Sequence, residues 1–223
     1  MMDLPGIDDR LLQEDLRNLR LINRFFGGLS ATRKHIARLF ARVPAGREIR
    51  ILDLASGSGD QPIALVRYAR SVHRRVHITA VDRNPTMLGV SRELTAGFPE
   101  IRILEADITK LDGKTWDADI VLCSLALHHF SIPDAVRLLA TMYRLSSVGF
   151  IVNDLNRNWI AAWSAWIYTH LTTRNPLTLN DSYASVLRAF TPSELRTMSE
   201  KAGLAHFHIH NEPMFRLVLV GEH

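Results

Sequence analysis

The 223-residue sequence predicts a doubly wound α/β fold: a mostly parallel seven-stranded sheet with an antiparallel C-terminal strand pair, N-terminal helices and a helical lid insertion. Two observations carry this prediction. Five short runs of branched aliphatic residues alternate with segments of helical character, which is typical of a parallel sheet with helices on its faces. Near the C-terminus, two further apolar runs are separated only by a short polar turn, and so direct a connection makes the two strands antiparallel.

The length and the 47% hydrophobic content indicate one main domain. We assign residues 1–46 to an N-terminal helical cap and residues 47–223 to the α/β domain, with the insertion at about 157–190. The net charge is only +4 and the basic residues are scattered, so nucleic acid is not an expected partner. The single cysteine, Cys123, lies in an apolar run, which excludes a disulfide and a cysteine-based metal site, and we expect no metal.

The N-terminus is acidic and lacks the basic flank of a signal peptide, and the longest apolar stretch, 159–166, is too short to span a bilayer. We therefore expect a soluble, cytoplasmic protein with no integral membrane span. Upstream of the sheet, apolar residues at helical spacing predict a first helix before Gly27 and Gly28, and a second helix is expected over 31–42. The residues that define the first helix are Leu12, Leu16, Leu19, Ile22 and Phe26.

The five buried parallel strands are expected at residues 49–54, 76–81, 101–106, 120–123 and 150–152. Residues typical of the start of a helix lie between these strands. Asp60 precedes Pro62, and Asn84 is a cap residue followed by Pro85 at the first helical position. Beyond the fifth strand, a tryptophan-rich helix opens the insertion, and the segment TPSEL at 191–195 predicts a capping box at the start of a further helix.

The segment ILDLASGSGDQP, residues 51–62, places Gly57 and Gly59 directly after a strand and before a helix, where glycine lets the backbone approach a ligand closely. A dinucleotide site would require a third glycine where this chain has Pro62, so the loop favours a nucleoside ligand without a diphosphate. Asp53 at the end of the first strand could attract a positively charged amino group, and Asp82 at the end of the second could accept hydrogen bonds from ribose hydroxyls.

Asp107 follows the third strand, where it could accept from an adenine amine, with Met87 and Ile108 offering apolar faces to the ring. Together with these positions, the segments DLASGSGD, AVDRNPTML, EADI and SLALHHF resemble, in order and spacing, the successive motifs of class I, Rossmann-like methyltransferases that use S-adenosylmethionine. The resemblance covers roughly residues 48–155.

This resemblance implies S-adenosylmethionine as cofactor and S-adenosylhomocysteine as product. It implies that Asp53, Gly57 and Gly59 lie at the methionine end, Asp82 at the ribose, and Met87, Asp107 and Ile108 around the adenine, with Ser124 facing the methionine portion. One position departs from the family loop, because Ala55 stands where its first glycine is common.

Methyl transfer from a sulfonium is an in-line displacement that needs a base only when the acceptor carries a proton. His128 and His129 follow the fourth strand, and a neutral imidazole suits the deprotonation of a phenol. The resemblance favours His129, and His170 in the insertion is the rival base. Each histidine could equally be structural.

After the fifth strand, Asn153 and Asp154 are expected at the pocket mouth, with Arg157 either contacting substrate or pairing with Asp154. Tyr168 adds a polar-tipped ring to the tryptophan-rich helix, most of which we expect to form core or a homodimer contact, while part could line the site of an aromatic or lipid-like acceptor.

The insertion resembles the acceptor lid of bacterial enzymes that methylate quinones, phenols and polyketide-derived aromatics. We therefore expect O-methylation of a phenolic hydroxyl in secondary metabolism, with C-methylation of a quinone-type ring as the second choice. Three alternatives stay open: a binding module that has lost catalysis, a nucleic-acid methyltransferase, and a nicotinamide dehydrogenase. The first conflicts with the intact Asp53 and Asp82, the second with the absence of an N-P-P-Y or D-P-P-Y motif after the fourth strand, and the third with Pro62.

Overall fold

The computed structural model describes residues 14–15, 18, 20–21, 28–111 and 116–223. Seven strands form one sheet in the order β3-β2-β1-β4-β5-β7-β6. The first five strands are parallel, and β7 is antiparallel to both β5 and β6. The strands are β1 (Ile49–Leu54), β2 (Val76–Asp82), β3 (Ile101–Glu105), β4 (Ala118–Ser124), β5 (Ser146–Leu155), β6 (Phe207–Glu212) and β7 (Arg216–Glu222). The predicted fold class is thus confirmed.

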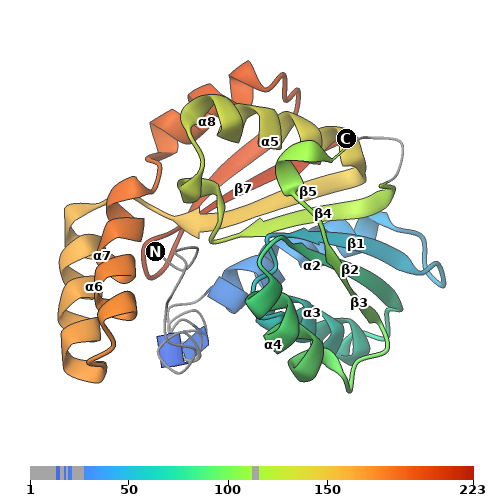
Figure 1. Cartoon of the computed structure of the whole chain (residues 1–223). Coiled ribbons are helices and arrows are strands. Elements are labelled where there is room, and N and C mark those ends of the chain that lie inside the picture. Colours follow the sequence, from blue (N-terminus) through green and yellow to red (C-terminus); the bar gives the residue numbers. More distant parts are fainter. Residues whose placement is uncertain (1–13, 16–17, 19, 22–27, 112–115) are drawn as a thin grey trace.

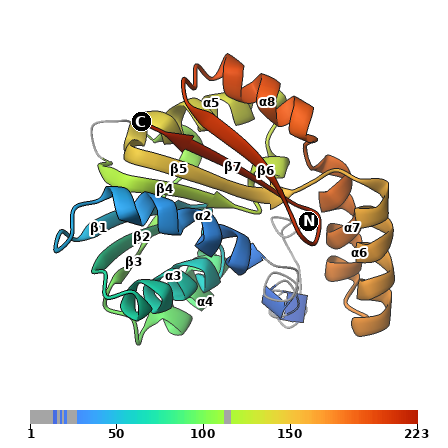
Figure 2. The ribbon, with the colours of Figure 1, turned by 180° about the vertical axis from the view of Figure 1, so that it is seen from behind.

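Helices cover both faces of the sheet (Figures 1 and 2). They are α2 (Gly28–Arg42), α3 (Asp60–Ser71), α4 (Pro85–Thr95), α5 (Ile132–Leu145), α6 (Trp159–Thr172), α7 (Pro176–Arg188) and α8 (Pro192–Lys201), with short 3₁₀ turns η1 (Ile108–Lys110) and η2 (Leu127–His129). Alternation along β1 sends Ile49 and Ile51 into one core with α2 and α3, and Leu52 and Leu54 into the other with α5 and α8. Strands buried on both faces explain the continuous apolar runs in the sequence.

Local sequence signals placed most helix starts correctly. The Asn84 side chain accepts from the backbone N–H groups of Thr86 and Met87, and Thr191 and Glu194 form the predicted capping box. The helix start expected at Asp60 is confirmed, since Asp60 is the first residue of α3, and Gly59, with φ 80°, is the residue before it. The first N-terminal helix expected around 12–26 falls largely outside the described residues.

The insertion consists of α6 and α7, which pack against each other beside the end of the sheet rather than on one of its faces (Figures 1 and 2). The tryptophans of α6 are not core residues, which corrects part of our expectation: Trp159 is 73% exposed and Trp163 60%. The core-forming side of α6 carries alanine instead, at Ala161 and Ala162. None of the helices in the described part of the chain combines the length and the hydropathy that a bilayer span needs.

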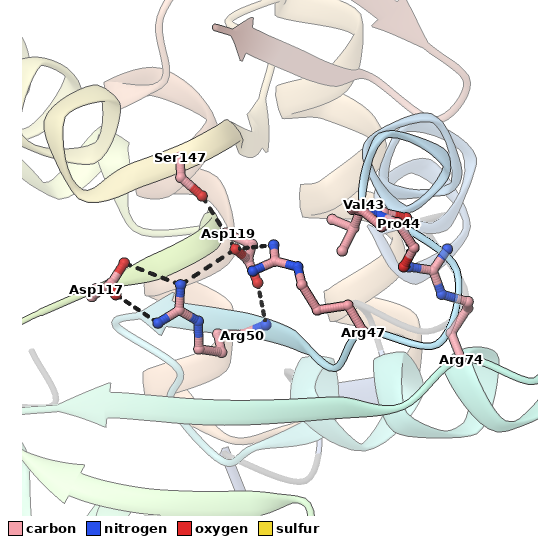
Figure 3. A network of polar contacts seen from close by, with 8 residues as sticks. All are labelled: Val43, Pro44, Arg47, Arg50, Arg74, Asp117, Asp119 and Ser147. Carbon is pink, nitrogen blue, oxygen red and sulfur yellow. Dashed lines mark hydrogen bonds and ion pairs between the residues drawn. The ribbon is translucent and has the colours of Figure 1, made fainter.

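A polar network ties β1 to β4 and β5 at the amino ends of these strands (Figure 3). The buried carboxylate of Asp119 accepts from the Arg50 backbone N–H at 2.8 Å, from the Arg47 guanidinium at 2.6 Å and from the Ser147 hydroxyl at 3.1 Å. Although burial alone would raise the pKa of Asp119, these hydrogen bonds and the charges of the two arginines lower it below its ordinary value of 3.8.

We expect Asp119→Asn to lower the free energy of unfolding at pH 7 by about 2 kcal/mol, because an amide replaces one acceptor oxygen with a donor. A carboxyl with a lowered folded-state pKa stabilises the protein above its unfolded pKa and loses that contribution as pH falls through the folded value. The difference between the two proteins in urea unfolding should therefore shrink below about pH 4. A difference that is independent of pH would show that the Asp119 charge contributes nothing.

Candidate active site

A cavity of about 320 Å³ opens at the carboxyl ends of the central strands. Strand order reverses between β1 and β4, and open α/β sheets bind ligands at such a switch point. The loop after β1, the end of β4 and the start of β7 supply one side of the wall, and α6 and α7 supply the other. The insertion therefore closes over the switch point, as a lid would.

In the loop after β1, every second residue adopts a left-handed conformation: Ala55 (φ 53°), Gly57 (φ 57°) and Gly59 (φ 80°). A Cβ on Gly59 would lie 2.6 Å from the Ser91 hydroxyl, and one on Gly57 would lie 3.2 Å from the Met87 methyl group. Both glycines are thus required by conformation and by space. Ala55 adopts the same conformation at a cost of roughly 1 kcal/mol, which explains why glycine is common there in the family it resembles.

Asp82 anchors this loop to β2. One carboxylate oxygen accepts from the Gly57 N–H and the other from the Asn84 N–H, both at 2.9 Å. A carboxylate has about four acceptor positions, so two remain after these bonds. Asp82 lines the cavity, where the remaining positions suit two vicinal hydroxyls.

Asp53 is the most unusual group in the cavity wall. Its side chain is buried, and neither carboxylate oxygen has a hydrogen-bond partner among the described residues. Burial, followed by the charges of Asp60 and Asp82, raises the pKa of Asp53 well above its usual range. An ammonium group bound in the cavity would supply the missing donors and the opposite charge.

His128 and Asp154 form a buried pair in the same cavity. The His128 Nδ1 lies 2.6 Å from one Asp154 oxygen, and the other oxygen accepts from the His128 backbone N–H at 3.0 Å. The second ring nitrogen, Nε2, is buried without a hydrogen-bond partner in the described structure, and His128 lines the cavity. Although burial alone would lower the pKa of His128, the charge and hydrogen bond of Asp154 raise it above 6.5.

The two other predicted histidines differ in position. His129 also lines the cavity, with its ring 4.2 Å from that of His128, and burial followed by the charge of His128 lowers its pKa. His170 is a correction, because it lies on the exposed side of α6, donates a hydrogen bond from Nδ1 to the Trp166 carbonyl, and is not among the described residues that line the cavity. Helical periodicity explains this, since residues 161, 165 and 168 of α6 face the cavity instead.

The remaining cofactor candidates divide into two groups. Ser124 lines the cavity and accepts a hydrogen bond from Gln61 at 3.0 Å, and Met87 lines it as well. Asp107 and Ile108 are not among the described residues that line the cavity. Asp107 caps η1, because its carboxylate accepts from the Thr109 N–H and hydroxyl. Ile108 packs into the hydrophobic core. Their role toward adenine stays a prediction.

Two predicted substrate contacts are structural in this fold. Asn153 is buried, and its amide donates to the Gly28 carbonyl at 2.6 Å and to the Thr32 hydroxyl at 2.9 Å, so that it holds α2 rather than facing the cavity. Arg157 pairs with Glu194 at the start of α8, not with Asp154, because Asp154 is turned inward to His128. Tyr168, by contrast, lines the cavity from α6 as expected.

Sequence reasoning missed Gln61, Asp181 and Arg216, all of which line the cavity. Gln61 lies in the first turn of α3 and also donates to Thr32 at 2.6 Å, which links α2 to the start of α3. Arg216 carried a readable signal, because it is a charged residue at the head of the apolar run LVLV. Asp181 offered none, since an acid in a polar stretch of a helix is ordinarily solvated surface.

Residues 51–149 match a family described as a methyltransferase domain. A carboxy-S-adenosyl-L-methionine synthase of Dichelobacter nodosus (strain VCS1703A) is 29% identical over 126 residues, which is 52% of this chain and 51% of that protein. A demethylmenaquinone methyltransferase of Staphylococcus aureus (strain MRSA252) is 28% identical over 104 residues, 47% of this chain and 41% of that one. The matched segments thus span about half of the length of the first curated relative and less than half of the second.

Solved structures share the fold at low sequence identity. The plantazolicin methyltransferase BpumL in complex with SAH aligns over 98% of this chain and 91% of its own, with a TM-score of 0.71 and 14% identity. An O-methyltransferase family 2 protein from Planctomyces limnophilus DSM 3776, in complex with apigenin, aligns over 98% of this chain and 62% of its own, with a TM-score of 0.61 and 21% identity. At these identities the likeness concerns the fold.

Proposed function

We propose, from the premise that residues 51–149 match a methyltransferase domain, that the protein transfers a methyl group from S-adenosylmethionine to a phenolic hydroxyl of a small aromatic acceptor. The observation that carries the proposal is the meeting of two features in one cavity. The loop after β1, with Asp53 and Asp82, lines the same cavity as His128, which is paired with Asp154.

The residues present fit S-adenosylmethionine. The buried carboxyl of Asp53 suits its ammonium group, Asp82 suits its ribose hydroxyls, and the left-handed loop at Gly57 and Gly59 leaves room that side chains would fill. When bound, S-adenosylmethionine supplies an electrophilic methyl group on a sulfonium, and the positive charge on sulfur is neutralised as the methyl is transferred.

The chain's own residues would then act on the acceptor. Asp154 fixes the tautomer of His128 by accepting from Nδ1–H, which leaves Nε2 able to accept the phenolic proton. The same carboxylate stabilises the imidazolium that forms, while the phenolate oxygen keeps the electron pair that makes the new bond to carbon. The lid helices α6 and α7 limit the access of water to this step.

The second candidate is C-methylation of a quinone-type ring, which the likeness to the demethylmenaquinone methyltransferase favours. The same base would accept a proton from a ring carbon. A catalytically inactive binding module is the candidate of another class, and the complete Asp53, Gly57 and Asp82 arrangement argues against it. A cytoplasmic location, a homodimer and a role in secondary metabolism remain predictions.

Calorimetric titration with S-adenosylhomocysteine, with NAD as the control ligand, tests the cofactor first because it needs no acceptor. We expect micromolar binding of S-adenosylhomocysteine alone. A panel of phenols and quinols with labelled S-adenosylmethionine then tests transfer, and the position of the label separates oxygen from carbon. Binding without transfer to any member would favour the inactive module, and no binding would contradict the proposed cofactor.

The charge of Asp154 should be visible in the titration of His128. We expect the pKa of His128 to lie above 6.5 in the natural protein, and to fall in Asp154→Asn because burial then acts without the compensating charge. NMR titration of the imidazole protons measures both values, and His128→Gln assigns the resonance among the ten histidines. Since only neutral His128 accepts a proton, methyl transfer should rise with pH through the measured pKa. Equal pKa values in the two proteins would contradict the pairing.

A further inference from the structure

Helix α6 carries a stripe of large apolar side chains on its outer side. The members of this α6 stripe recur at helical spacing: Trp159, Ile160, Trp163, Trp166, Ile167 and Leu171. Each of the six side chains is at least 42% exposed, and that of Leu171 is 81% exposed. Large apolar side chains gathered on one exposed surface ordinarily mark a place where another molecule binds.

The opposite side of α6 is already used by the fold. Ala161 and Ala162 pack with Val186 of α7, and Ala165 and Tyr168 line the cavity. Because successive residues of a helix are turned by about 100°, these positions lie across α6 from the stripe. In Figures 1 and 2, α6 forms the outer margin of the molecule beside α7. The stripe therefore faces away from both the core and the cavity.

Tryptophan dominates the stripe, and its rings lie along the surface. The ring of Trp166 lies 6.0 Å from that of Trp163, edge to face, and 4.2 Å from that of His170 on its other side. An indole combines a large apolar body with one N–H donor, and tryptophan is enriched where proteins meet the interface of a bilayer. Such an interface offers acyl chains to the rings and hydrated headgroups to the N–H groups.

The charges around the stripe favour an anionic surface. Residues 157–190 contain three arginines, all exposed, and one acid, Asp181, which lines the cavity. The three are Arg157, Arg174 and Arg188. Acids of other segments compensate for only part of this charge, since Glu194 pairs with Arg157 and Glu14 accepts from Asn175. The exposed rim of the insertion is thus net positive, which suits the negative headgroups of an anionic bilayer.

The same charges disfavour a second copy of the chain as the occupant. A twofold contact through α6 places the same surface on both sides of the interface. It would bring the Arg174 and Arg188 groups of two copies toward each other, without an exposed acid of the insertion to pair with them. An anionic lipid surface has no such conflict.

We propose that the α6 stripe docks on the surface of a bilayer that contains anionic phospholipids, with α6 lying in the plane of the interface. The 14 residues of α6 extend about 21 Å, whereas a span requires about 20 residues. The apolar side chains enter the boundary between headgroups and acyl chains, and Arg174 and Arg188 lie near the phosphates. Docking places the lid of the cavity at the membrane surface. The proposal does not depend on which acceptor is methylated.

The fluorescence of the α6 indoles tests the proposal. In Trp116→Phe, every remaining tryptophan belongs to α6. The probes are vesicles of phosphatidylcholine alone and of an equal mixture of phosphatidylcholine and phosphatidylglycerol, each with brominated acyl chains that quench nearby indoles. We expect the mixed vesicles to shift the emission to shorter wavelength and to quench it. We also expect the protein to bind them about tenfold or more tightly than the neutral vesicles.

Co-sedimentation of variants with the same vesicles separates the contributions. Trp163→Ser/Trp166→Ser should bind both kinds of vesicle about tenfold or more weakly. Arg174→Gln should bind about fivefold more weakly to the mixed vesicles alone. Val72→Ser is the matched control, because it removes a side chain that is 40% exposed at the end of α3, next to the amino end of β2 and away from the lid. It should bind as the natural protein does, and melting temperatures show that each variant is folded.

Four results would overturn the proposal. The first is a natural protein that binds neither kind of vesicle, and the second is equal binding by Trp163→Ser/Trp166→Ser and the natural protein. The third is an emission that already corresponds to an apolar environment before vesicles are added, because protein would then cover the stripe. The fourth is a natural dimer that Trp163→Ser/Trp166→Ser converts to a monomer in analytical ultracentrifugation, which would assign the stripe to a second copy.

Discussion

Replacing Asp82 with alanine is expected to weaken S-adenosylhomocysteine binding by at least about 100-fold. The change removes two contacts to ribose hydroxyls, and hydrogen bonds to a charged group contribute about 1.5–3 kcal/mol each. It also removes the acceptor that holds the Gly57 N–H, so the loop loses its tie to β2. Calorimetric titration measures the affinity directly and requires no acceptor.

Two further variants separate a lost contact from a damaged fold. Asp82→Asn keeps one acceptor oxygen and should bind with intermediate affinity. Asp119→Asn destabilises the sheet at the opposite ends of β1 and β4, where it cannot touch the ligand, and should bind S-adenosylhomocysteine as the natural protein does. Equal affinity of Asp82→Ala and the natural protein would rule out the ribose assignment.

The fold was readable from the sequence because its central strands are buried on both faces. Continuous apolar runs identified all five parallel strands, and the run at 49–54 coincides with β1. The ends were less accurate: β5 extends over Ser146–Leu155, well beyond the apolar residues 150–152. At the amino end Ser146 pairs with Ala118 of β4, and at the carboxyl end Asp154 and Leu155 pair with β7, since an antiparallel neighbour can extend a strand through polar residues.

The cofactor side of the site was predictable for a related reason. Asp53, Gly57 and Asp82 follow strand ends within short segments, so their positions depend on local geometry that a motif records. The acceptor side depends on contacts between distant segments. The pairing of His128 with Asp154, 26 positions apart, and the approach of Arg216 are decided by the order of β4, β5 and β7, which no local pattern specifies.

Asn153 and Asp154 illustrate how little a motif can say about neighbouring residues. Both follow the strand predicted at 150–152 and were expected at the pocket mouth, but both lie within β5. Alternation along β5 sends the two side chains to opposite faces, so that Asn153 bonds to α2 while Asp154 reaches His128. Because Asp154 is turned toward His128, Arg157 pairs with Glu194 instead.

Replacing His128 with alanine is expected to lower kcat for methyl transfer to a phenolic acceptor by about 10²- to 10⁴-fold, the usual contribution of a positioned general base. The affinity for S-adenosylhomocysteine should change little, because His128 belongs to η2, which packs against α7. Comparison with His129→Ala and His170→Ala supplies matched controls. His129→Ala removes the neighbouring ring of the cavity wall, and His170→Ala removes a ring on the exposed side of α6.

The kcat values of the His128, His129 and His170 variants show which residue is the base. If His128 is the base, its variant alone loses the rise of kcat with pH, and a more acidic phenol should restore part of the rate because it ionises without help. If His129 is the base, the loss and the rescue move to that variant, and the raised pKa of His128 would then reflect a structural ion pair with Asp154. Wild-type turnover by His128→Ala and His129→Ala alike would mean that the acceptor is already ionised when it binds.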